Sequence, residues 1–294
     1  MKTRILQLFI LMLLGLGVQA QVTTSAINGL ITDTKNEPMI GATVVALHVP
    51  SGTTYGAVTR EDGRFNLPGL RVGGPYKITV SYVGYSEASD ENVFLNLGQT
   101  FTINKQLVED GVNIGELVIT GTKNSIMNDK KTGASTNIGL RAINSLPTLS
   151  RSISDFTRAT PQANGRSIGG ADARFNNLTI DGSIFNNSFG LSDLPGGQTN
   201  STPISLDAIE QIQINLAPFD VREGGFTGAG INAVTRSGGN EFSGSAFFNN
   251  RSERFVGDNA AGSDVLTADF DVKQYGFRLG GPIIKDKLFF FVNG

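Results

Sequence analysis

The sequence predicts a mainly β chain in three successive parts: an N-terminal β-sandwich, an α+β domain and the start of a truncated transmembrane β-barrel. Glycine supplies 37 of the 294 residues, about twice its average share, which argues against a helical bundle. The first third of the chain alternates short apolar runs with turn residues. Beyond residue 238, apolar and small or polar residues alternate as in membrane-spanning strands.

The composition excludes several classes of function. The chain has no cysteine and a single histidine, which removes disulfides, thiol nucleophiles, thiolate metal sites and histidine pairs. A net charge of −2 with 17% charged residues argues against nucleic acid as a partner. We expect His48 to be an exposed or half-buried structural residue. No catalytic, cofactor-binding or metal site is predicted, so the protein is not expected to be an enzyme.

Residues 1–20 have the pattern of a cleaved secretory signal peptide. Lys2 and Arg4 form a short basic start, and a nearly unbroken apolar run extends to Val18. Ala20 places a small residue before a cleavage point at Gln21. The apolar run is short for a spanning helix, which needs about 20 residues. The mature chain is therefore predicted to begin at Gln21 in an exported protein.

Residues 21–108 are predicted to form the sandwich. The expected strands lie at 27–32, 42–48, 63–67 and 76–83, and Asp62-Gly63 is a hairpin-type turn signal. The segments Gly29-Leu-Ile-Thr-Asp33, Glu37-Pro-Met-Ile-Gly-Ala-Thr-Val-Val45, Thr59-Arg-Glu-Asp-Gly-Arg-Phe65 and Ser81-Tyr-Val-Gly-Tyr85 closely resemble the carboxypeptidase-regulatory-like domain. That resemblance implies a non-catalytic accessory module, which often precedes outer-membrane receptors.

Residues 109–125 are predicted to be a linker that contains one β-prone run. This run, Glu116-Leu-Val-Ile-Thr-Gly-Thr122, resembles the opening of the plug domain of TonB-dependent receptors. The resemblance implies a segment that adds a strand to the periplasmic partner TonB through backbone hydrogen bonds. The alternative is that it is only the first plug strand. The segment consists of Glu116, Leu117, Val118, Ile119 and Thr120.

Residues 126–237 resemble the plug itself. A short helix or two is expected over 143–158, broken at Leu146-Pro147 and capped at Ser154-Asp155. Two ordered motifs carry the resemblance: Ala173-Arg-Phe-Asn-Asn-Leu-Thr-Ile-Asp-Gly182, and Ile204-Ser-Leu-Asp-Ala-Ile-Glu-Gln-Ile-Gln-Ile214 leading to Gly230-Ile-Asn-Ala-Val-Thr-Arg-Ser-Gly238. The turn over 217–230 departs from the usual plug. This departure fits the Oar-like branch and weakens any transfer of ligand contacts from siderophore receptors.

Residues 238–294 are predicted to be the first strands of an outer-membrane β-barrel. Phe242, Gly244, Ala246 and Phe248 alternate with Ser243, Ser245, Phe247 and Asn249. Tyr275, Phe277 and Leu279 continue the pattern before a turn over 282–287. A spanning strand uses about 9 to 11 residues and the smallest barrels have about 8 strands. We therefore expect a truncated barrel that ends inside a strand.

Charged residues of the plug motifs are the candidates for contacts between plug and barrel. A plug in a polar lumen must be releasable, which suits hydrogen bonds and ion pairs better than apolar packing. The ordinary alternative is turn and surface charge. The favoured residues are Arg222, Glu223 and Arg236, and the remaining candidates are Arg174 and Asp181.

The three parts together resemble an Oar-like or SusC-like TonB-dependent outer-membrane receptor. The resemblance implies import of a scarce or bulky substrate, such as a siderophore-type chelate, a glycan or a peptide, by a TonB-energised plug rearrangement. It implies the TonB-ExbB-ExbD system, outer-membrane lipid and a substrate-capturing surface lipoprotein as partners, with the N-terminal domain in the periplasm. The alternative is an Oar-like structural, adhesion or secretion-related protein that uses the plug and barrel as an anchor.

Overall fold

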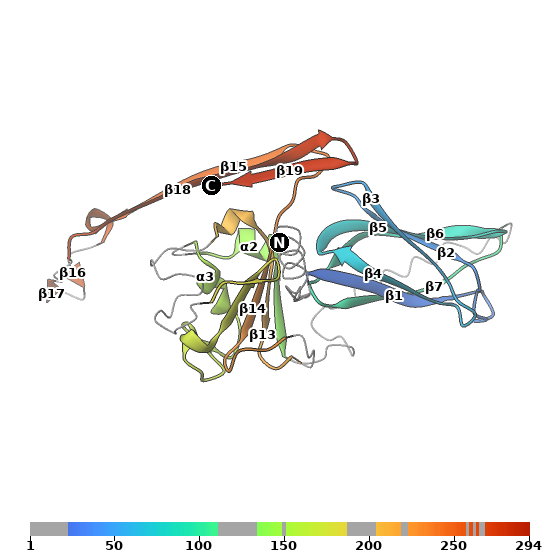
Figure 1. The fold of residues 1–294 in the computed structure, drawn as a ribbon, viewed down its shortest axis with the longest axis horizontal. Coiled ribbons are helices and arrows are strands. Elements are labelled where there is room, and N and C mark those ends of the chain that lie inside the picture. The colour runs from blue at the N-terminus through green and yellow to red at the C-terminus, as the bar shows by residue number, and fades with distance from the viewer. Residues whose placement is uncertain are drawn as a thin grey trace, which may run out of the picture.

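The computed structural model describes residues 23–110, 134–148, 151–186, 204–218, 223–256, 259–260, 263–264 and 268–294. Figure 1 shows three successive parts: a two-sheet domain, a mixed sheet with short helices, and a long antiparallel sheet at the C-terminus. The mainly β prediction is confirmed. Within the described residues, no helix has the length and apolar character needed to cross a membrane. The predicted signal peptide lies outside the described residues.

The first part is a β-sandwich of seven strands with one core. The strands are β1 (Thr24–Thr32), β2 (Thr43–His48), β3 (Thr53–Val58), β4 (Arg64–Arg71), β5 (Gly73–Tyr82), β6 (Tyr85–Leu95) and β7 (Thr100–Gln106). One sheet has the order β4-β1-β7 and the other β3-β2-β5-β6. Alternate residues of both sheets are buried between them, such as Ile27, Val44 and Ile78. Their removal from water is the main force that holds the sheets together.

The predicted strands and turn of the sandwich are found, and three further strands complete it. Gly63 has φ +70°, and the Arg64 N–H donates to Oδ1 of Asp62 at 3.1 Å in the predicted turn. Phe65 and Leu67 then share a buried face, each 3% exposed. Strands β3, β6 and β7 carry mainly half-buried and exposed side chains. The alternation of apolar residues in these strands is therefore weak, and the sequence did not predict them.

The second part is a five-stranded mixed sheet covered by short helices. Its strands are β8 (Ser135–Gly139), β11 (Asn177–Ile180), β12 (Ser183–Ile184), β13 (Ile209–Asn215) and β14 (Gly230–Thr235), in the order β12-β11-β14-β13-β8. Helices α2 (Leu140–Ser145) and α3 (Ile153–Thr157) contribute Ile143, Ile153 and Phe156 to the core. Smaller elements are β9 (Ala163–Asn164), β10 (Ser167–Ile168), η1 (Ala173–Phe175) and η2 (Leu206–Ala208).

The two faces of this sheet differ in chemistry. Ile138, Ile212, Ala233 and Ile180 lie opposite one another across β8, β13, β14 and β11, and they form the apolar face. Next to these residues on each strand, a row of polar residues crosses the sheet on the other face: Asn137, Gln213, Asn232 and Thr179. Because side chains alternate between faces, the helices cover one face and leave a polar face for another partner.

Two short helices are found in the predicted region, but α2 begins at Leu140, before the predicted start at residue 143, and the cap of α3 also differs. Helix α2 ends before Leu146, whose backbone is extended ahead of Pro147. The N-cap of α3 is Ser152, so the predicted cap at Ser154-Asp155 is wrong. Asp155 instead occupies the third helical position, and its carboxylate accepts a hydrogen bond from the Ser152 N–H at 3.5 Å. This reciprocal arrangement requires the capping serine three residues before the acid.

The third part is an antiparallel sheet in the order β15-β18-β19. Its strands are β15 (Ser243–Ser252), β18 (Asp271–Ile284) and β19 (Leu288–Asn293); the short elements η3 (Glu253–Phe255), β16 (Asn259–Ala260) and β17 (Ser263–Asp264) lie between β15 and β18. The predicted turn over 282–287 is shorter than expected, because β18 continues to Ile284. Pro282 still pairs with Phe289, next to an irregularity in the register.

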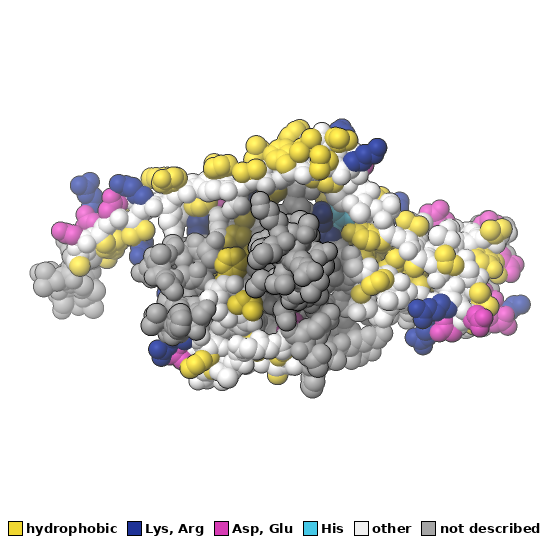
Figure 2. Space-filling view, viewed as in Figure 1, with side chains coloured by type: hydrophobic (Ala, Val, Ile, Leu, Met, Phe, Trp, Pro, Cys, Tyr) yellow, Lys and Arg dark blue, Asp and Glu magenta, His cyan; other side chains and the backbone are white. Residues whose placement is uncertain are grey.

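One face of this sheet is apolar and exposed. Phe248 lies opposite Tyr275, and Ala246 lies opposite Phe277. Tyr275 is 80% exposed and Phe248 is 65% exposed. Figure 2 shows the apolar side chains gathered on the side of this sheet that faces away from the other parts. On the opposite face, Nε of Arg278 donates to Oγ of Ser245 at 2.9 Å. The predicted alternation of apolar and polar faces is therefore present.

We predict that residues 21–108 fold alone, because one core cluster is built entirely from this segment. In this fragment, Gly29→Ala should lower the free energy of unfolding by about 3 kcal/mol, since the new methyl group would overlap the Ile103 carbonyl and the Phe65 ring. Gly56→Ala is the matched control, because the nearest atom to its added Cβ lies 4.0 Å away. Thermal melting followed by circular dichroism measures both. A random-coil spectrum, or equal stability of the two variants, would contradict the prediction.

Candidate functional site

Two predicted regions, the 116–120 segment and Arg222, lie outside the described residues. Arg174 lies in η1, where its Nε is 3.0 Å from Oδ1 of Asp172. The hydrogen bonds that Arg174 donates hold the pKa of the Asp172 carboxyl below its usual value. Both side chains are about half exposed. This pair organises the short turn that leads into β11.

Asp181 and Glu223 bind groups within the central domain. Asp181 has φ +48° just after β11, and its carboxylate accepts hydrogen bonds from the Thr235 N–H at 2.9 Å and the Thr235 hydroxyl at 2.7 Å. These bonds join the ends of the parallel strands β11 and β14. Glu223 accepts a hydrogen bond from the amide of Asn215 at 2.6 Å, at the end of β13. Through these bonds both acids fix strand ends of the central domain.

Arg236 is the predicted residue that reaches the boundary between the parts. Its side chain is 8% exposed, and its Nε donates to the Ile209 carbonyl at 3.0 Å. The same Nε is 4.0 Å from Oε2 of Glu210. Its backbone N–H donates to the Ala208 carbonyl at 2.7 Å. Arg236 therefore fixes the chain just beyond β14 against the start of β13, immediately before the third part begins.

The charges around Arg236 come from all three parts. Burial raises the pKa of Glu210, while Arg236, Arg278 and Arg71 oppose that rise. Burial also lowers the pKa of Arg236, and the positive charge of Arg278 adds to that effect. Arg71 belongs to β4 of the sandwich and Arg278 to β18 of the third part. A single carboxylate of the central domain thus lies within the fields of three guanidinium groups.

Arg151 makes a contact between the central domain and the third part that the sequence did not reveal. Its guanidinium carbon lies 4.1 Å from the centre of the Phe247 ring on β15. Its Nη2 is 2.9 Å from Oδ2 of Asp207. The one available signal was Phe247 itself, because it interrupts the otherwise small or polar alternate positions of β15. An aromatic residue on that face provides the ring that a cation–π contact needs.

The polar face of β13 binds the sandwich. Oε1 of Gln211 accepts a hydrogen bond from the Leu97 N–H at 2.9 Å, and Nε2 of Gln213 donates to the Leu97 carbonyl at 2.8 Å. Nε2 of Gln211 also donates to Oδ1 of Asn96 at 3.0 Å. Gln211 is 2% exposed, Gln213 is 5% exposed and Leu97 is fully buried. Two glutamines thus satisfy both backbone groups of one buried residue.

The sandwich also contacts the link into the third sheet. The Asn240 N–H donates to the Pro50 carbonyl at 2.7 Å, and its side-chain amide binds the carboxylate of Asp286 at 2.6 Å. A Cβ on Gly239 would lie 2.6 Å from the Pro50 carbonyl oxygen. A Cβ on Gly238 would overlap the carbonyl of Phe290. The two glycines therefore permit a close approach that other residues would block.

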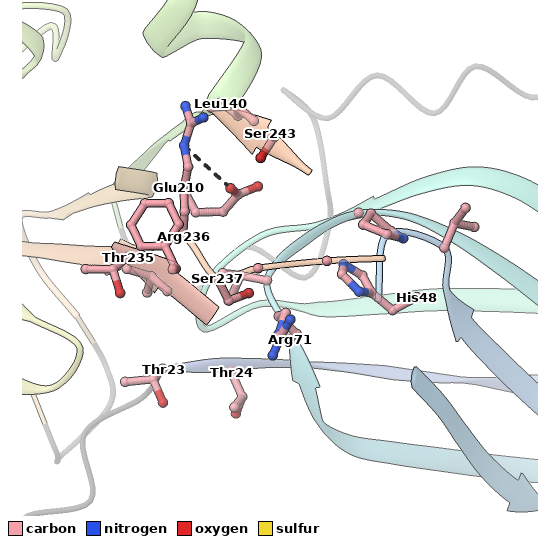
Figure 3. A pocket seen from close by; sticks show the side chains of 18 of the residues that line it. Thr23, Thr24, His48, Arg71, Leu140, Glu210, Thr235, Arg236, Ser237 and Ser243 are labelled. Atoms are coloured by element: carbon pink, nitrogen blue, oxygen red, sulfur yellow. Dashed lines mark ion pairs between the residues drawn. The ribbon is translucent and has the colours of Figure 1, made fainter. Parts of the chain in front are cut away.

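A cavity of about 900 Å³ lies where the three parts meet. Figure 3 shows Arg71 and His48 reaching it from the sandwich, with Glu210 and Arg236 from the central domain. His48 is 6% exposed, contrary to the expectation of an exposed or half-buried residue, because it continues the buried alternation of Val44 and Ala46 along β2. Burial, together with Arg71, lowers its pKa to about 4, so its imidazole is neutral at pH 7.

Comparison with known families assigns both ends of the chain. Residues 26–108 match the carboxypeptidase regulatory-like domain, and residues 234–294 match an outer membrane beta barrel domain. The chain is 27% identical over 300 residues to the TonB-dependent transporter Oar of Myxococcus xanthus. That similarity covers 94% of this chain. The chain is similar to a TonB-dependent transporter over nearly all of its residues.

The chain spans about a quarter of this relative's length, since the similarity covers 27% of Oar. Among solved structures, it resembles the siderophore receptor PirA of Acinetobacter baumannii with 23% identity and a TM-score of 0.41, over 54% of this chain and 24% of that one. PirA of Pseudomonas aeruginosa gives 20% identity and a TM-score of 0.37, over 53% of this chain and 26% of that one. The word plug, taken from the sequence prediction for residues 126–237, serves below only as a label for the central domain.

We predict that Gln213→Leu loosens the sandwich from the plug. The Leu97 carbonyl would lose its donor inside a buried contact, which costs about 1–3 kcal/mol. Hydrogen exchange followed by mass spectrometry should show faster exchange over residues 95–99. Gln162→Ala is the control, because Gln162 is an exposed plug residue. Unchanged exchange in Gln213→Leu would show that the contact does not hold the two domains.

Proposed function

We propose that the full-length protein is an outer-membrane TonB-dependent receptor that imports a scarce or bulky substrate. The observation that carries the proposal is the similarity to the transporter Oar across 94% of this chain, in a chain whose last residues match an outer membrane beta barrel domain. The exposed apolar face of β15, β18 and β19 supports contact with outer-membrane lipid. The predicted signal peptide supports export, and the sandwich would then lie in the periplasm.

The contacts between the plug and the third sheet suit a plug that moves. Arg151 contacts Phe247 through a cation–π interaction. The carboxylate of Glu210 is attracted by Arg278, which at the same time repels Arg236. The apolar core of the plug, in contrast, is enclosed between its own sheet and helices. Polar contacts can be exchanged for contacts with water at small net cost, whereas exposure of an apolar core is costly. The plug can therefore separate from the third sheet without unfolding.

We propose residues 116–120 as the segment that pairs with TonB. They precede β8, which lies at the edge of the plug sheet and pairs with β13. A pull on the preceding chain would load β8 first, and β8 would transmit the load to the strand that carries Gln211 and Gln213. TonB-ExbB-ExbD would supply the energy. Siderophore-type chelates, glycans and peptides are the substrate classes that the proposal includes, and a surface lipoprotein would capture the substrate.

Val118→Pro in the full-length protein tests the proposed pairing. Proline removes a backbone donor and blocks strand addition, so binding to the C-terminal domain of TonB and energised uptake should both be lost. Surface binding of the substrate should be unchanged. Lys123→Pro, in the same linker but outside the segment, is the control and should retain uptake.

The uptake assay compares cells with and without the gene, using labelled ferric siderophores, oligosaccharides and peptides. A substrate that enters only when both the gene and TonB are present supports the receptor. Normal TonB binding and uptake in Val118→Pro would overturn the pairing segment alone. Absence of any TonB-dependent uptake, together with loss of a surface or adhesion property in cells without the gene, would favour the structural alternative.

A further inference from the structure

Arg151 has a backbone conformation that residues with a side chain rarely adopt. Its φ is +49°, in the left-handed region, immediately before Ser152, which is the N-cap of α3. A residue persists in this region only where the surrounding contacts hold it there, and such residues are concentrated at sites of binding and switching. The contacts of the Arg151 side chain therefore have to compensate for this strain.

Two contacts hold the guanidinium group of Arg151, one inside the plug and one on the third sheet. Within the plug, Nη2 lies 2.9 Å from Oδ2 of Asp207 in η2, and the two side chains are 25% and 20% exposed. On the third sheet, the guanidinium carbon lies 4.1 Å from the centre of the Phe247 ring. Nε of Arg151 is buried without a hydrogen-bond partner among the described residues, because the planar group lies over a ring instead of an acceptor.

The third sheet holds the Phe247 ring in place. Phe247 lies opposite Gly276 on β18, and a Cβ on Gly276 would lie 2.7 Å from Cε1 of the ring. The ring thus lies across the glycine, where any side chain would displace it. Phe247 also lies further along β15 than Ser243, which lines the junction cavity. The contact with Arg151 therefore holds the plug at a second place on the third sheet, in addition to the junction.

We propose that Arg151 is a positioning residue that holds the plug on the third sheet, by stacking on Phe247 while Asp207 fixes it to the plug. The contact is reversible, because it consists of one stacked pair and its loss frees residue 151 to leave the strained conformation. Separation of Arg151 from Phe247 is a required step of plug movement, a part of the inference that rests on the proposed function.

Hydrogen exchange of the full-length protein in detergent tests the position of Arg151 without any transport. Arg151→Gln should speed exchange across α3 by about fivefold, as for loss of a partly buried cation–π contact. Phe247→Leu should also speed exchange in α3, although it changes only the third sheet. Phe248→Leu is the matched control, because Phe248 is the next residue of β15 and its side chain, 65% exposed, lies on the opposite face. Arg151→Lys keeps a cation over the ring and should recover part of the protection.

The double variant separates contact with the third sheet from stability of the plug alone. Because the two side chains act through one contact, Arg151→Gln combined with Phe247→Leu should exchange no faster in α3 than Arg151→Gln by itself. Unchanged exchange in Phe247→Leu, with faster exchange in Arg151→Gln, would show that Arg151 acts only inside the plug and would overturn the proposal. Additive effects of the two changes would overturn it as well.

A reversible cross-link tests whether the contact has to open. The chain has no cysteine, so Arg151→Cys and Phe247→Cys in the full-length protein can be joined by a short bis-methanethiosulfonate linker. Linked cells should lose TonB-dependent uptake, keep surface binding of the substrate and regain uptake after reduction with dithiothreitol. The same double variant treated with a monofunctional methanethiosulfonate is the control, because it carries the modification without the link.

The outcomes of the cross-link separate the two proposals. Uptake that continues in the linked protein would overturn the required separation of Arg151 from Phe247. Absence of TonB-dependent uptake in the unmodified protein would overturn the proposed function instead, and hydrogen exchange would still decide whether Arg151 positions the plug.

Discussion

The hydrogen bonds between β13 and Leu97 are the interaction on which the arrangement of the three parts depends. A strand whose two faces are both buried must satisfy two different neighbours. On β13, Ile212 and Ile214 pack into the plug core, while Gln211 and Gln213 bind the backbone of the sandwich. Leu97 is fully buried, so its N–H and carbonyl need these partners. The alternation of isoleucine and glutamine thus builds a domain core and a domain contact from one strand.

This contact has consequences for the other boundaries. It brings the sandwich close to the end of the plug, where Pro50 meets Asn240 at the start of the third sheet. It also brings Arg71 toward Glu210, whose pKa responds to that charge. The cavity and its mixed charges therefore arise from the same arrangement. A movement of β13 would change the sandwich contact, the charge cluster and the approach to the third sheet together.

The sequence predicted the elements well where their patterns are local. Alternating apolar residues located the main sandwich strands, and the alternation around Phe248 and Tyr275 identified a sheet with one apolar face. Spacing alone could not choose between Ser152 and Ser154 as the cap of α3, because both positions offer a hydroxyl. The contacts between parts were not predictable, since Gln211 and Leu97 are 114 positions apart and a buried glutamine resembles an exposed one in sequence.

The predicted charged site was only partly informative for a similar reason. A charged residue in a motif indicates a polar environment but does not indicate which residue it binds. Asp181 binds Thr235 and Arg174 binds Asp172, both within the plug, whereas Arg236 lies at the junction. Arg151 reaches Phe247 only because the fold brings them together. Apart from Arg236 and the aromatic Phe247, the residues that join the parts carry no signal in the sequence, because the tertiary arrangement sets them.

The distance between spin labels on the sandwich and the plug tests this account most directly. The chain has no cysteine, so Glu87→Cys and Asn164→Cys introduce two labelling sites at exposed positions of β6 and β9. Double electron–electron resonance on the full-length protein should give one narrow distance distribution, which broadens when Gln211→Ala is added. A broad distribution in the doubly labelled protein that retains Gln211 would contradict the account, because it would show a sandwich that is not held on the plug.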